Sequence, residues 1–147
     1  MTDTIETPRI LTLDWARARE RARPVRYAVF VVEQQVPVEL EWDEWDELSD
    51  HALAIDARGT TLGTGRLLPD GHLGRMAVLP GYRGYGVGQV LLDTAIDWFR
   101  EQCHEAVHIS AQVHAIGFYE RAGFRLCSEA YDDAGIPHRD MVLPLTP

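Results

Sequence analysis

A run of glycines between residues 83 and 88 is the clearest chemical signature in the chain. The segment reads Arg-Gly-Tyr-Gly-Val-Gly, follows an apolar stretch at 73–78 and precedes an amphipathic one at 89–103. Glycine tolerates positive φ and lets a ligand approach the backbone closely. A loop that leads into a helix N-terminus also directs free N–H groups and the positive end of the helix dipole at one point. We therefore predict that this loop binds a phosphate or pyrophosphate.

Three anion-binding patterns could account for the loop, and a structural loop that binds nothing is a fourth alternative. A Walker P-loop requires a Gly-Lys-Ser/Thr step, and the chain contains no lysine. A dinucleotide fold requires an acidic residue about twenty positions further on, after the next strand. Glu105 lies near that distance but precedes the next predicted strand. The third pattern, Arg/Gln-x-x-Gly-x-Gly/Ala after a strand that ends in Val, is matched by Arg83, Gly86 and Gly88.

This third pattern resembles the acetyl-CoA loop of the GNAT superfamily of N-acetyltransferases. The resemblance implies that the pyrophosphate is held by the backbone N–H groups of Arg83, Gly84, Tyr85, Gly86, Val87 and Gly88. It also implies that the fourth and fifth strands splay apart around the pantetheine arm, which is held with the acetyl carbonyl by the backbone of Met76, Ala77 and Val78. A splay leaves backbone N–H and C=O groups unpaired, and pantetheine amides can pair with them.

The order of the predicted elements agrees with this resemblance. In chain order the patterns predict strand 9–13, helices 15–23 and 25–34 separated at Pro24, strands 51–56, 61–68 and 73–78, helix 89–103, strand 106–113, helix 115–121 and strands 124–130 and 138–145. The helix at 25–34 has an apolar stripe of Val25, Val29 and Val32. The order β-αα-βββ-α-β-α-ββ predicts one α/β (α+β) domain over 1–147. By resemblance it is a GNAT fold, with a mixed seven-stranded sheet splayed between strands 4 and 5.

Composition places the chain among ordinary globular proteins and excludes several partners. Hydrophobic residues make up 46% and charged residues 25% of the chain. The net charge of −9 argues against nucleic acid, because phosphate contacts require clustered Lys and Arg. No apolar run approaches the ~20 residues of a membrane span, and the N-terminal residues lack signal-peptide features. Cys103 and Cys127 are expected to be buried free thiols, so we predict a cytoplasmic protein that binds neither nucleic acid nor membrane.

A second segment supports the same family and carries the chemistry of transfer. Residues 118–124, Phe-Tyr-Glu-Arg-Ala-Gly-Phe, resemble the family's Phe-Tyr-x-x-x-Gly-Phe segment, whose tyrosine commonly protonates the departing thiolate. By resemblance Tyr119 has this role, whereas an isolated tyrosine would usually be a packing residue. The implied reaction is direct attack of a primary amine, on a small molecule, peptide or protein, on the thioester of acetyl-CoA. A non-catalytic acyl-CoA-binding sensor of the same fold is the alternative, and a homodimer is left open.

Three shorter segments resemble one branch of the family, the ElaA-like proteins. They are 26–34 (Arg-Tyr-Ala-Val-Phe-Val-Val-Glu-Gln), 111–114 (Ala-Gln-Val-His) and 135–138 (Gly-Ile-Pro-His). The resemblance sharpens the prediction of fold and cosubstrate, but it does not identify the acceptor.

Histidines are candidates for the acceptor side of the site. No His/Cys spacing resembles a zinc site, so no metal is predicted. His114 lies at the end of the fifth predicted strand, beside the helix that carries Tyr119, and is our candidate for a second catalytic residue. His51 and His138 are further candidates for lining the acceptor cavity. An unperturbed imidazole has a pKa suited to a general base, although a lone histidine is more often structural.

The segment between Arg26 and Arg58 contains no basic residue. It contains nine acidic ones: Glu33, Glu39, Glu41, Asp43, Glu44, Asp46, Glu47, Asp50 and Asp56. Together with Trp42 and Trp45 in a predicted loop at 38–50, these residues could form an acidic rim, with Glu33 binding the acceptor. Such a rim would attract a cationic amine. The alternative is a solvated acidic loop without a binding role.

Overall fold

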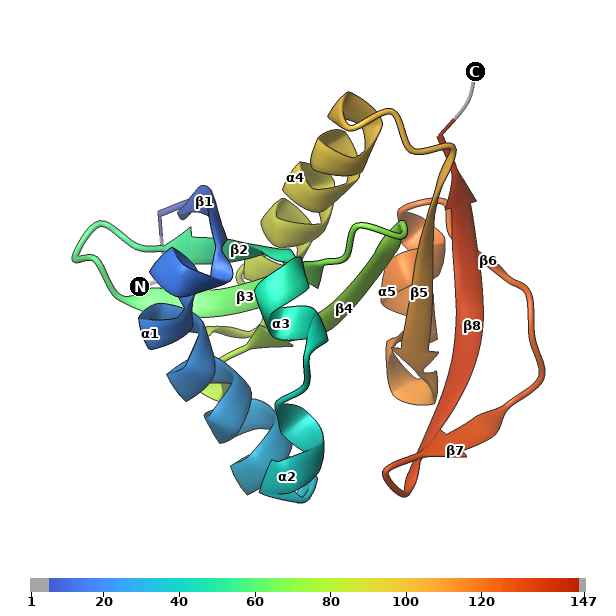
Figure 1. Ribbon diagram of the computed structural model, residues 1–147, viewed down its shortest axis with the longest axis horizontal. Helices are drawn as coiled ribbons and strands as arrows, with labels where there is room; N and C mark the ends of the chain where they lie inside the picture. The colour runs from blue at the N-terminus through green and yellow to red at the C-terminus, as the bar shows by residue number, and fades with distance from the viewer. Residues whose placement is uncertain (1–5, 146–147) are drawn as a thin grey trace.

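The computed structural model describes residues 6–145, which form a mixed sheet with helices on both faces (Figure 1). The first five and last two residues, including part of the segment expected to lack signal-peptide features, lie outside the described residues. The sheet order is β1-β2-β3-β4-β5-β8-β6, and β7 pairs with β8. The strands are β1 (Arg9–Asp14), β2 (Asp50–Ile55), β3 (Thr61–Leu67), β4 (His72–Val78), β5 (Ala106–Gln112), β6 (Arg125–Leu126), β7 (Tyr131–Asp133) and β8 (Ile136–Pro144). The helices are α1 (Trp15–Arg26), the π-helix η1 (Tyr27–Glu33), α2 (Val38–Glu41), α3 (Trp45–Leu48), α4 (Val87–Glu101), α5 (Ile116–Arg121) and the 3₁₀ turns η2 (Pro80–Tyr82) and η3 (Val113–Ala115).

Different helices cover the two faces of the sheet. On one face α1, which is N-capped by the Asp14 side chain, packs Ala18 and Ala22 against Leu53 of β2. On the other face, residues of α4 such as Leu91 pack into the larger core, which extends to β5 and β8. Because β2 is covered on both sides, almost all of its residues are buried. The amphipathic helix predicted after the glycine loop is therefore confirmed.

β4 and β5 are parallel, but they separate after a short paired region. Among the described residues, only His72 with His108 and Leu73 with Ile109 are in register. Further along, an extra residue in β4 shifts its register with β3, and Arg75 in this bulge has a φ of 48°. A bulge bends its strand and increases its twist. The C-terminal halves of β4 and β5 therefore diverge, which confirms the predicted splay.

The helix after β1 does not break at Pro24, so that part of the prediction is wrong. α1 continues through Pro24 and leads directly into η1. Pro24 has no N–H group to donate to the carbonyl of Glu20. Both residues are exposed, so water can hydrogen-bond to this carbonyl instead. The π-helix then changes the spacing of the side chains. Val32 is consequently 63% exposed, although it was predicted to lie in the buried stripe.

The predicted strand at 124–130 is reduced to the two residues of β6, and β7 forms beyond it at 131–133, so the described residues form eight strands instead of seven. β6 and β7 both pair with β8. β7 and β8 are joined through Ala134 and Gly135, whose φ angles are 53° and 79°. Positive φ at both central residues is the mark of a two-residue type I′ hairpin turn. This tight turn starts β8 at Ile136, two residues before the predicted start.

Both cysteines are free but exposed, so their expected burial is wrong. Cys103 lies beyond the end of α4 with a φ of 63°, and not on the apolar face of the helix. Cys127 follows the short strand β6. Over residues 6–145, no helix combines the length and the apolar character needed to cross a bilayer.

Candidate functional site

The glycine loop leads into α4 in an open conformation. Gly86 is the N-cap of α4 and, like Gly84, has a φ of 85°. A Cβ at either glycine would meet no heavy atom within 4 Å beyond its chain neighbours. The first N–H groups of a helix have no intrahelical acceptor, so α4 presents donors to a space that the protein does not fill. The residues present therefore fit a pyrophosphate.

Arg83 connects this loop to two other elements. Its guanidinium donates two hydrogen bonds of 2.7 Å to the carboxylate of Glu33 on η1. Its Nε donates to the carbonyl of Val78, the last residue of β4, at 3.0 Å. The hydrogen bonds from Arg83 lower the pKa of Glu33, an effect opposed by desolvation. Glu33 is thus an ion-paired anion with both oxygens occupied, and this placement gives no support to a direct role in binding the acceptor.

Tyr119 lies next to the loop. Its neighbour Phe118 would be 3.5 Å from a Cβ at Gly88, which places the start of α5 against the start of α4. The Tyr119 ring packs edge-on against Phe118 and Phe124, with centroids 5.1 and 5.7 Å away. Burial raises the pKa of Tyr119 to about 12, so the phenol is protonated at neutral pH. Within residues 6–145 the hydroxyl has no hydrogen-bond partner, which leaves its proton available to a ligand.

One face of the sheet formed by β5, β8 and β7 is polar. It carries the side chains of His108, Ser110, Gln112, Tyr131, His138 and Asp140. Directly opposed residues of antiparallel strands share a face, and Gln112 is opposite His138 while Ser110 is opposite Asp140. The Tyr131 hydroxyl contacts both Ser110 Oγ and the carboxylate of Asp140. This face is therefore organised by side-chain hydrogen bonds between three strands.

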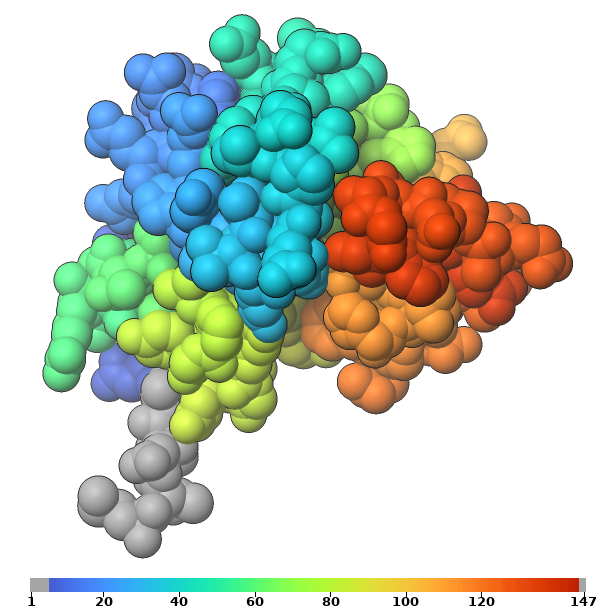
Figure 2. Space-filling view, turned by 90° about the horizontal axis from the view of Figure 1, so that it is seen from below, coloured from blue at the N-terminus to red at the C-terminus, as the bar shows by residue number. Residues whose placement is uncertain are grey.

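A pair of glutamines closes one end of the splay. The side chains of Gln34, after η1, and Gln112, at the end of β5, donate to each other at 3.2 and 2.8 Å. Figure 2 shows the segment around residues 30–40 beside the β7–β8 hairpin on this side of the molecule. The end of η1 therefore reaches the glycine loop through Glu33 and the polar face through Gln34. The sequence placed both residues in a helix but gave no sign of either contact.

Comparison with known proteins agrees with this geometry. Residues 18–145 match the family model described as the acetyltransferase (GNAT) domain. The chain belongs to the GNAT acetyltransferase family. YjcF of Bacillus subtilis (strain 168), an uncharacterized N-acetyltransferase, is 37% identical over 122 residues, which cover 80% of this chain and 86% of that protein. ElaA of Escherichia coli (strain K12) is 32% identical over 124 residues, 80% of this chain and 81% of ElaA.

Solved structures of family members share the fold. The crystal structure of E. coli ElaA has a TM-score of 0.81 at 27% identity and covers 92% of this chain and 98% of its own. An acyl-CoA N-acyltransferase from Pseudomonas aeruginosa has a TM-score of 0.82 at 29% identity and covers 92% and 99%. These matches confirm both the GNAT fold and the resemblance to the ElaA-like branch.

The three histidines predicted for the acceptor side lie in different environments. His114 is exposed on η3, close enough to Glu33 to act electrostatically on its carboxylate. His138 is 8% exposed on the polar face. His51 is 1% exposed, with Nε2 2.9 Å from the Asp46 carbonyl and its ring 4.6 Å from that of Trp15. An acceptor cannot reach His51 in this structure, because the side chain is buried between β2 and the α1–α3 segment.

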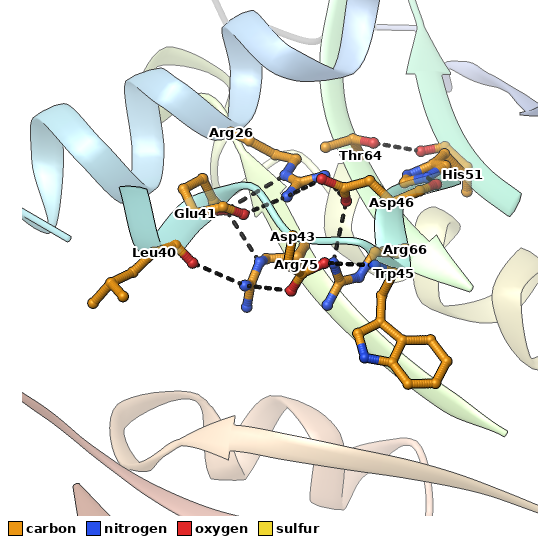
Figure 3. A network of polar contacts seen from close by, with 11 residues as sticks. Arg26, Leu40, Glu41, Asp43, Trp45, Asp46, His51, Thr64, Arg66 and Arg75 are labelled. Carbon is orange, nitrogen blue, oxygen red and sulfur yellow. Dashed lines mark hydrogen bonds and ion pairs between the residues drawn. The ribbon is translucent and has the colours of Figure 1, made fainter. Parts of the chain in front are cut away.

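The predicted acidic loop folds into α2 and α3, and its central carboxylates are paired with arginines (Figure 3). The six side chains of this network are Arg26, Glu41, Asp43, Asp46, Arg66 and Arg75. Arg26 and Asp46 approach to 2.7 Å, and Arg66 and Asp43 to 2.6 Å. Three cations balance three anions, so the expectation of an acidic rim is wrong for these residues. Arg66 and Arg75 come from β3 and β4, too far along the chain for the sequence to indicate the pairing.

The aromatic residues of this loop also have structural contacts. Trp42 lies against the guanidinium groups of Arg23 and Arg26, whose carbons are 4.8 and 4.9 Å from the centroid of its ring. Such cation–π contacts stabilise a buried arginine. Trp45 remains 37% exposed. Trp42 therefore covers the network, whereas part of Trp45 is accessible to a ligand.

The two buried carboxylates of the network should differ in their contribution to stability. Burial raises the pKa of Asp46, but hydrogen bonds and charges from Arg26 and Arg66 outweigh it and hold the pKa below its usual value. Burial dominates at Glu41 and raises its pKa. Asp46 therefore stabilises the fold above its unfolded pKa near 4, and this contribution is lost as the pH falls through the lower folded value. Ionised Glu41 has the opposite effect, because folding favours its protonated form.

We expect Asp46→Asn to lower the free energy of unfolding at pH 7 by about 3–5 kcal/mol, since it leaves Arg26 without its shortest partner. Glu41→Gln removes a charge whose burial is already unfavourable, so its loss should be clearly smaller. Urea denaturation of both variants would measure the two changes. Equal losses would contradict this account of the network.

Proposed function

We propose that this protein transfers the acetyl group of acetyl-CoA to a primary amine of a small molecule or peptide. One observation carries the proposal: an open glycine loop, the diverging end of β4 and the Tyr119 hydroxyl, which has no hydrogen-bond partner within residues 6–145, lie together at one end of the splay. A dinucleotide would also suit the loop, but a dinucleotide site would not account for the diverging end of β4 or the position of the Tyr119 hydroxyl. Family membership supports the proposal, because GNAT proteins typically use acyl-CoA.

The proposed contacts with acetyl-CoA are mostly backbone contacts. The N–H groups of 83–88 would bind the pyrophosphate. The backbone from Met76 to Val78, which runs beside β3 but is not paired with β5 among the described residues, would bind the pantetheine arm and the acetyl carbonyl. Charge-assisted hydrogen bonds contribute roughly 1.5–3 kcal/mol each. Three or four of them give micromolar affinity after the cost of association. The Arg83 side chain, engaged with Glu33 and Val78, would keep the loop in place without contacting the ligand.

The reaction replaces a carbon–sulfur bond with a carbon–nitrogen bond. The neutral amine attacks the thioester carbonyl carbon, CoA leaves as its thiolate, and one amine proton is lost. A thiol such as cysteine has a pKa of about 8.5, whereas that of Tyr119 is about 12. Full proton transfer from Tyr119 to the sulfur is therefore uphill. In this proposal Tyr119 donates a hydrogen bond to the developing thiolate, and solvent completes the protonation.

The paired state of the acidic segment changes what we expect of the acceptor. Steering by an exposed charged surface accelerates association by about 10–10³ and is lost as salt is added. Because three arginines neutralise Glu41, Asp43 and Asp46, we expect kcat/KM for a cationic amine to change less than about tenfold with ionic strength. Rates measured at low and high NaCl would test this, with a neutral acceptor as control. A steep fall of kcat/KM with salt for the cationic amine alone would contradict this expectation and support an exposed acidic rim.

A thiol-release assay with acetyl-CoA and a panel of primary amines tests the proposed function. We expect at least one class of amine to release CoA above the rate of acetyl-CoA hydrolysis, and the acetylated amine to be detectable by mass spectrometry. Calorimetry with acetyl-CoA and NAD should show binding of the former alone. Tight binding of acetyl-CoA without turnover would favour the sensor, and preference for NAD would favour a dinucleotide site.

A further inference from the structure

One imidazole of the polar face has its tautomer fixed by the backbone. His138 Nδ1 lies 2.7 Å from the carbonyl oxygen of Ile136, just after the type I′ turn. A carbonyl only accepts, so in the neutral ring Nδ1 carries the proton and Nε2 has the free lone pair. Among residues 6–145, Nε2 has no hydrogen-bond partner, and it is not one of the fully enclosed unpaired atoms. A basic nitrogen is therefore oriented and open to a ligand.

The register of the sheet places His138 level with the diverging end of β4. His72 pairs with His108, and one bulge residue is added in β4 beyond this point. Because of this extra residue, five residues of β4 span the same length as four residues of β5. Ala77 is therefore level with Gln112, on the opposite side of the splay. His138 is in turn opposite Gln112 on β8, where facing Cβ atoms are about 4.5–5.5 Å apart. Only β5 therefore lies between the strand that carries this imidazole and the proposed position of the thioester.

The other candidates for a base are engaged or are placed elsewhere. Glu33 has both oxygens paired with Arg83. Asp140 accepts from the Tyr131 hydroxyl, and burial and this bond raise the pKa of Tyr131 and keep it protonated. His108 lies four residues back along β5, about 13 Å away at 3.3 Å per residue. His114 is exposed on η3 and, within residues 6–145, makes no side-chain hydrogen bond that would fix its tautomer.

We propose that His138 is the general base of the transfer reaction. Its Nε2 takes one proton from the amine nitrogen as that nitrogen bonds to the acetyl carbon and the carbon–sulfur bond breaks. The imidazolium then passes the proton to solvent, from which the CoA thiolate recovers one, so that no proton is gained or lost overall. This inference rests on the proposed function and adds the residue that activates the acceptor.

The neighbours of His138 suit both of its protonation states. The Tyr131 ring stacks on it with centroids 6.1 Å apart and planes at 21°, and an aromatic face stabilises a cation. The groups that share its face are Tyr131 and Asp133 of β7, Gln112 of β5 and, on its own strand, the Asp140 carboxylate held by Tyr131. η3, which packs against the start of β8, adds His114. Asp133 and Asp140 are the carboxylates among these groups, and they favour the transient imidazolium.

Two substitutions separate a base from a structural histidine. In His138→Asn the side-chain amide nitrogen can still donate to the Ile136 carbonyl, but nothing basic replaces Nε2. His138→Ala removes both functions. We expect both variants to lower kcat about 10²-fold or more, with KM for acetyl-CoA unchanged and the Tm of His138→Asn close to that of the wild type. His108→Asn, the same change on the same face but at the paired end of the splay, should leave kcat unchanged.

The dependence of kcat on pH provides a readout that a structural role would not move. An acid limb of kcat in the wild type should be absent in His138→Asn. Imidazole added to His138→Asn should restore part of kcat. If His138→Asn kept wild-type kcat and its acid limb while the wild type acetylated amines, this inference alone would be overturned. A wild type that acetylated no amine would overturn the proposed function as well.

Discussion

Replacing Gly86 with valine should weaken acetyl-CoA binding by about 10²–10⁴-fold. Gly86 has a φ of 85° at the N-terminus of α4, a conformation that a β-branched residue adopts only with strain. The isopropyl group would also occupy the open space in front of the free N–H groups. Loss of two charge-assisted hydrogen bonds of roughly 1.5–3 kcal/mol each gives the stated range. Isothermal calorimetry of the variant would measure the change directly.

Gly59 provides a matched control for this experiment. It lies in the turn between β2 and β3 with a φ of 86° and, like Gly86, has no heavy atom within 4 Å of the position of a Cβ. Gly59→Val should therefore cost similar conformational strain and lower the Tm, while the affinity for acetyl-CoA stays at the wild-type value. Wild-type affinity in Gly86→Val would refute the role of the loop. Equal loss of affinity in both variants would assign the effect to general destabilisation.

Replacing Tyr119 with phenylalanine should lower kcat by about 10–10²-fold. The change keeps the ring against Phe118 and Phe124 and removes one hydrogen bond to a developing anion. Such a bond contributes roughly 1.5–3 kcal/mol, and each 1.36 kcal/mol of barrier is a factor of ten. Because this bond forms with the leaving thiolate, the loss should appear in kcat with little change in KM for acetyl-CoA.

The raised pKa of Tyr119 also leads to a prediction for the dependence of the rate on pH. A group with a pKa of about 12 stays protonated up to about pH 10, so the wild-type rate should show no alkaline fall due to Tyr119 in that range. Tyr27→Phe, on an exposed tyrosine of η1, serves as the control for loss of a hydroxyl. Full kcat in Tyr119→Phe, with an acceptor slow enough for chemistry to limit turnover, would assign stabilisation of the thiolate to another group.

Local patterns predicted the part of the molecule that binds the proposed cosubstrate. The loop from Arg83 to Gly88 and the helix after it are specified by adjacent residues, so glycine chemistry and helical periodicity were enough to place them. The same holds for the alternation in β5, whereas the role of Tyr119 came from the family resemblance. The positions of Met76 and Val78 at the splay came from the family resemblance and not from the residues themselves. These features depend on short stretches of chain, which a single sequence can reveal.

The parts that were mispredicted depend on contacts between distant segments. The acidic run near Glu41 was interpreted as an acidic rim or a solvated loop because its partners Arg66 and Arg75 are on strands that follow later in the chain. Pro24 was expected to separate two helices, but its exposed position lets water compensate for the lost bond. The tautomer of His138 depends on a turn whose first central residue is Ala134, a poor predictor of positive φ. Only the folded chain shows these relations.

The central claim is that the acetyl group leaves CoA for an amine at this site. Its most direct test measures CoA thiol and N-acetylated product in the same quenched reaction of wild type, Tyr119→Phe and Gly86→Val. The account predicts one thiol released per acetylated amine in the wild type, the same ratio at a lower rate in Tyr119→Phe, and no product at moderate acetyl-CoA in Gly86→Val. Thiol release without acetylated amine, or equal product from all three proteins, would contradict it.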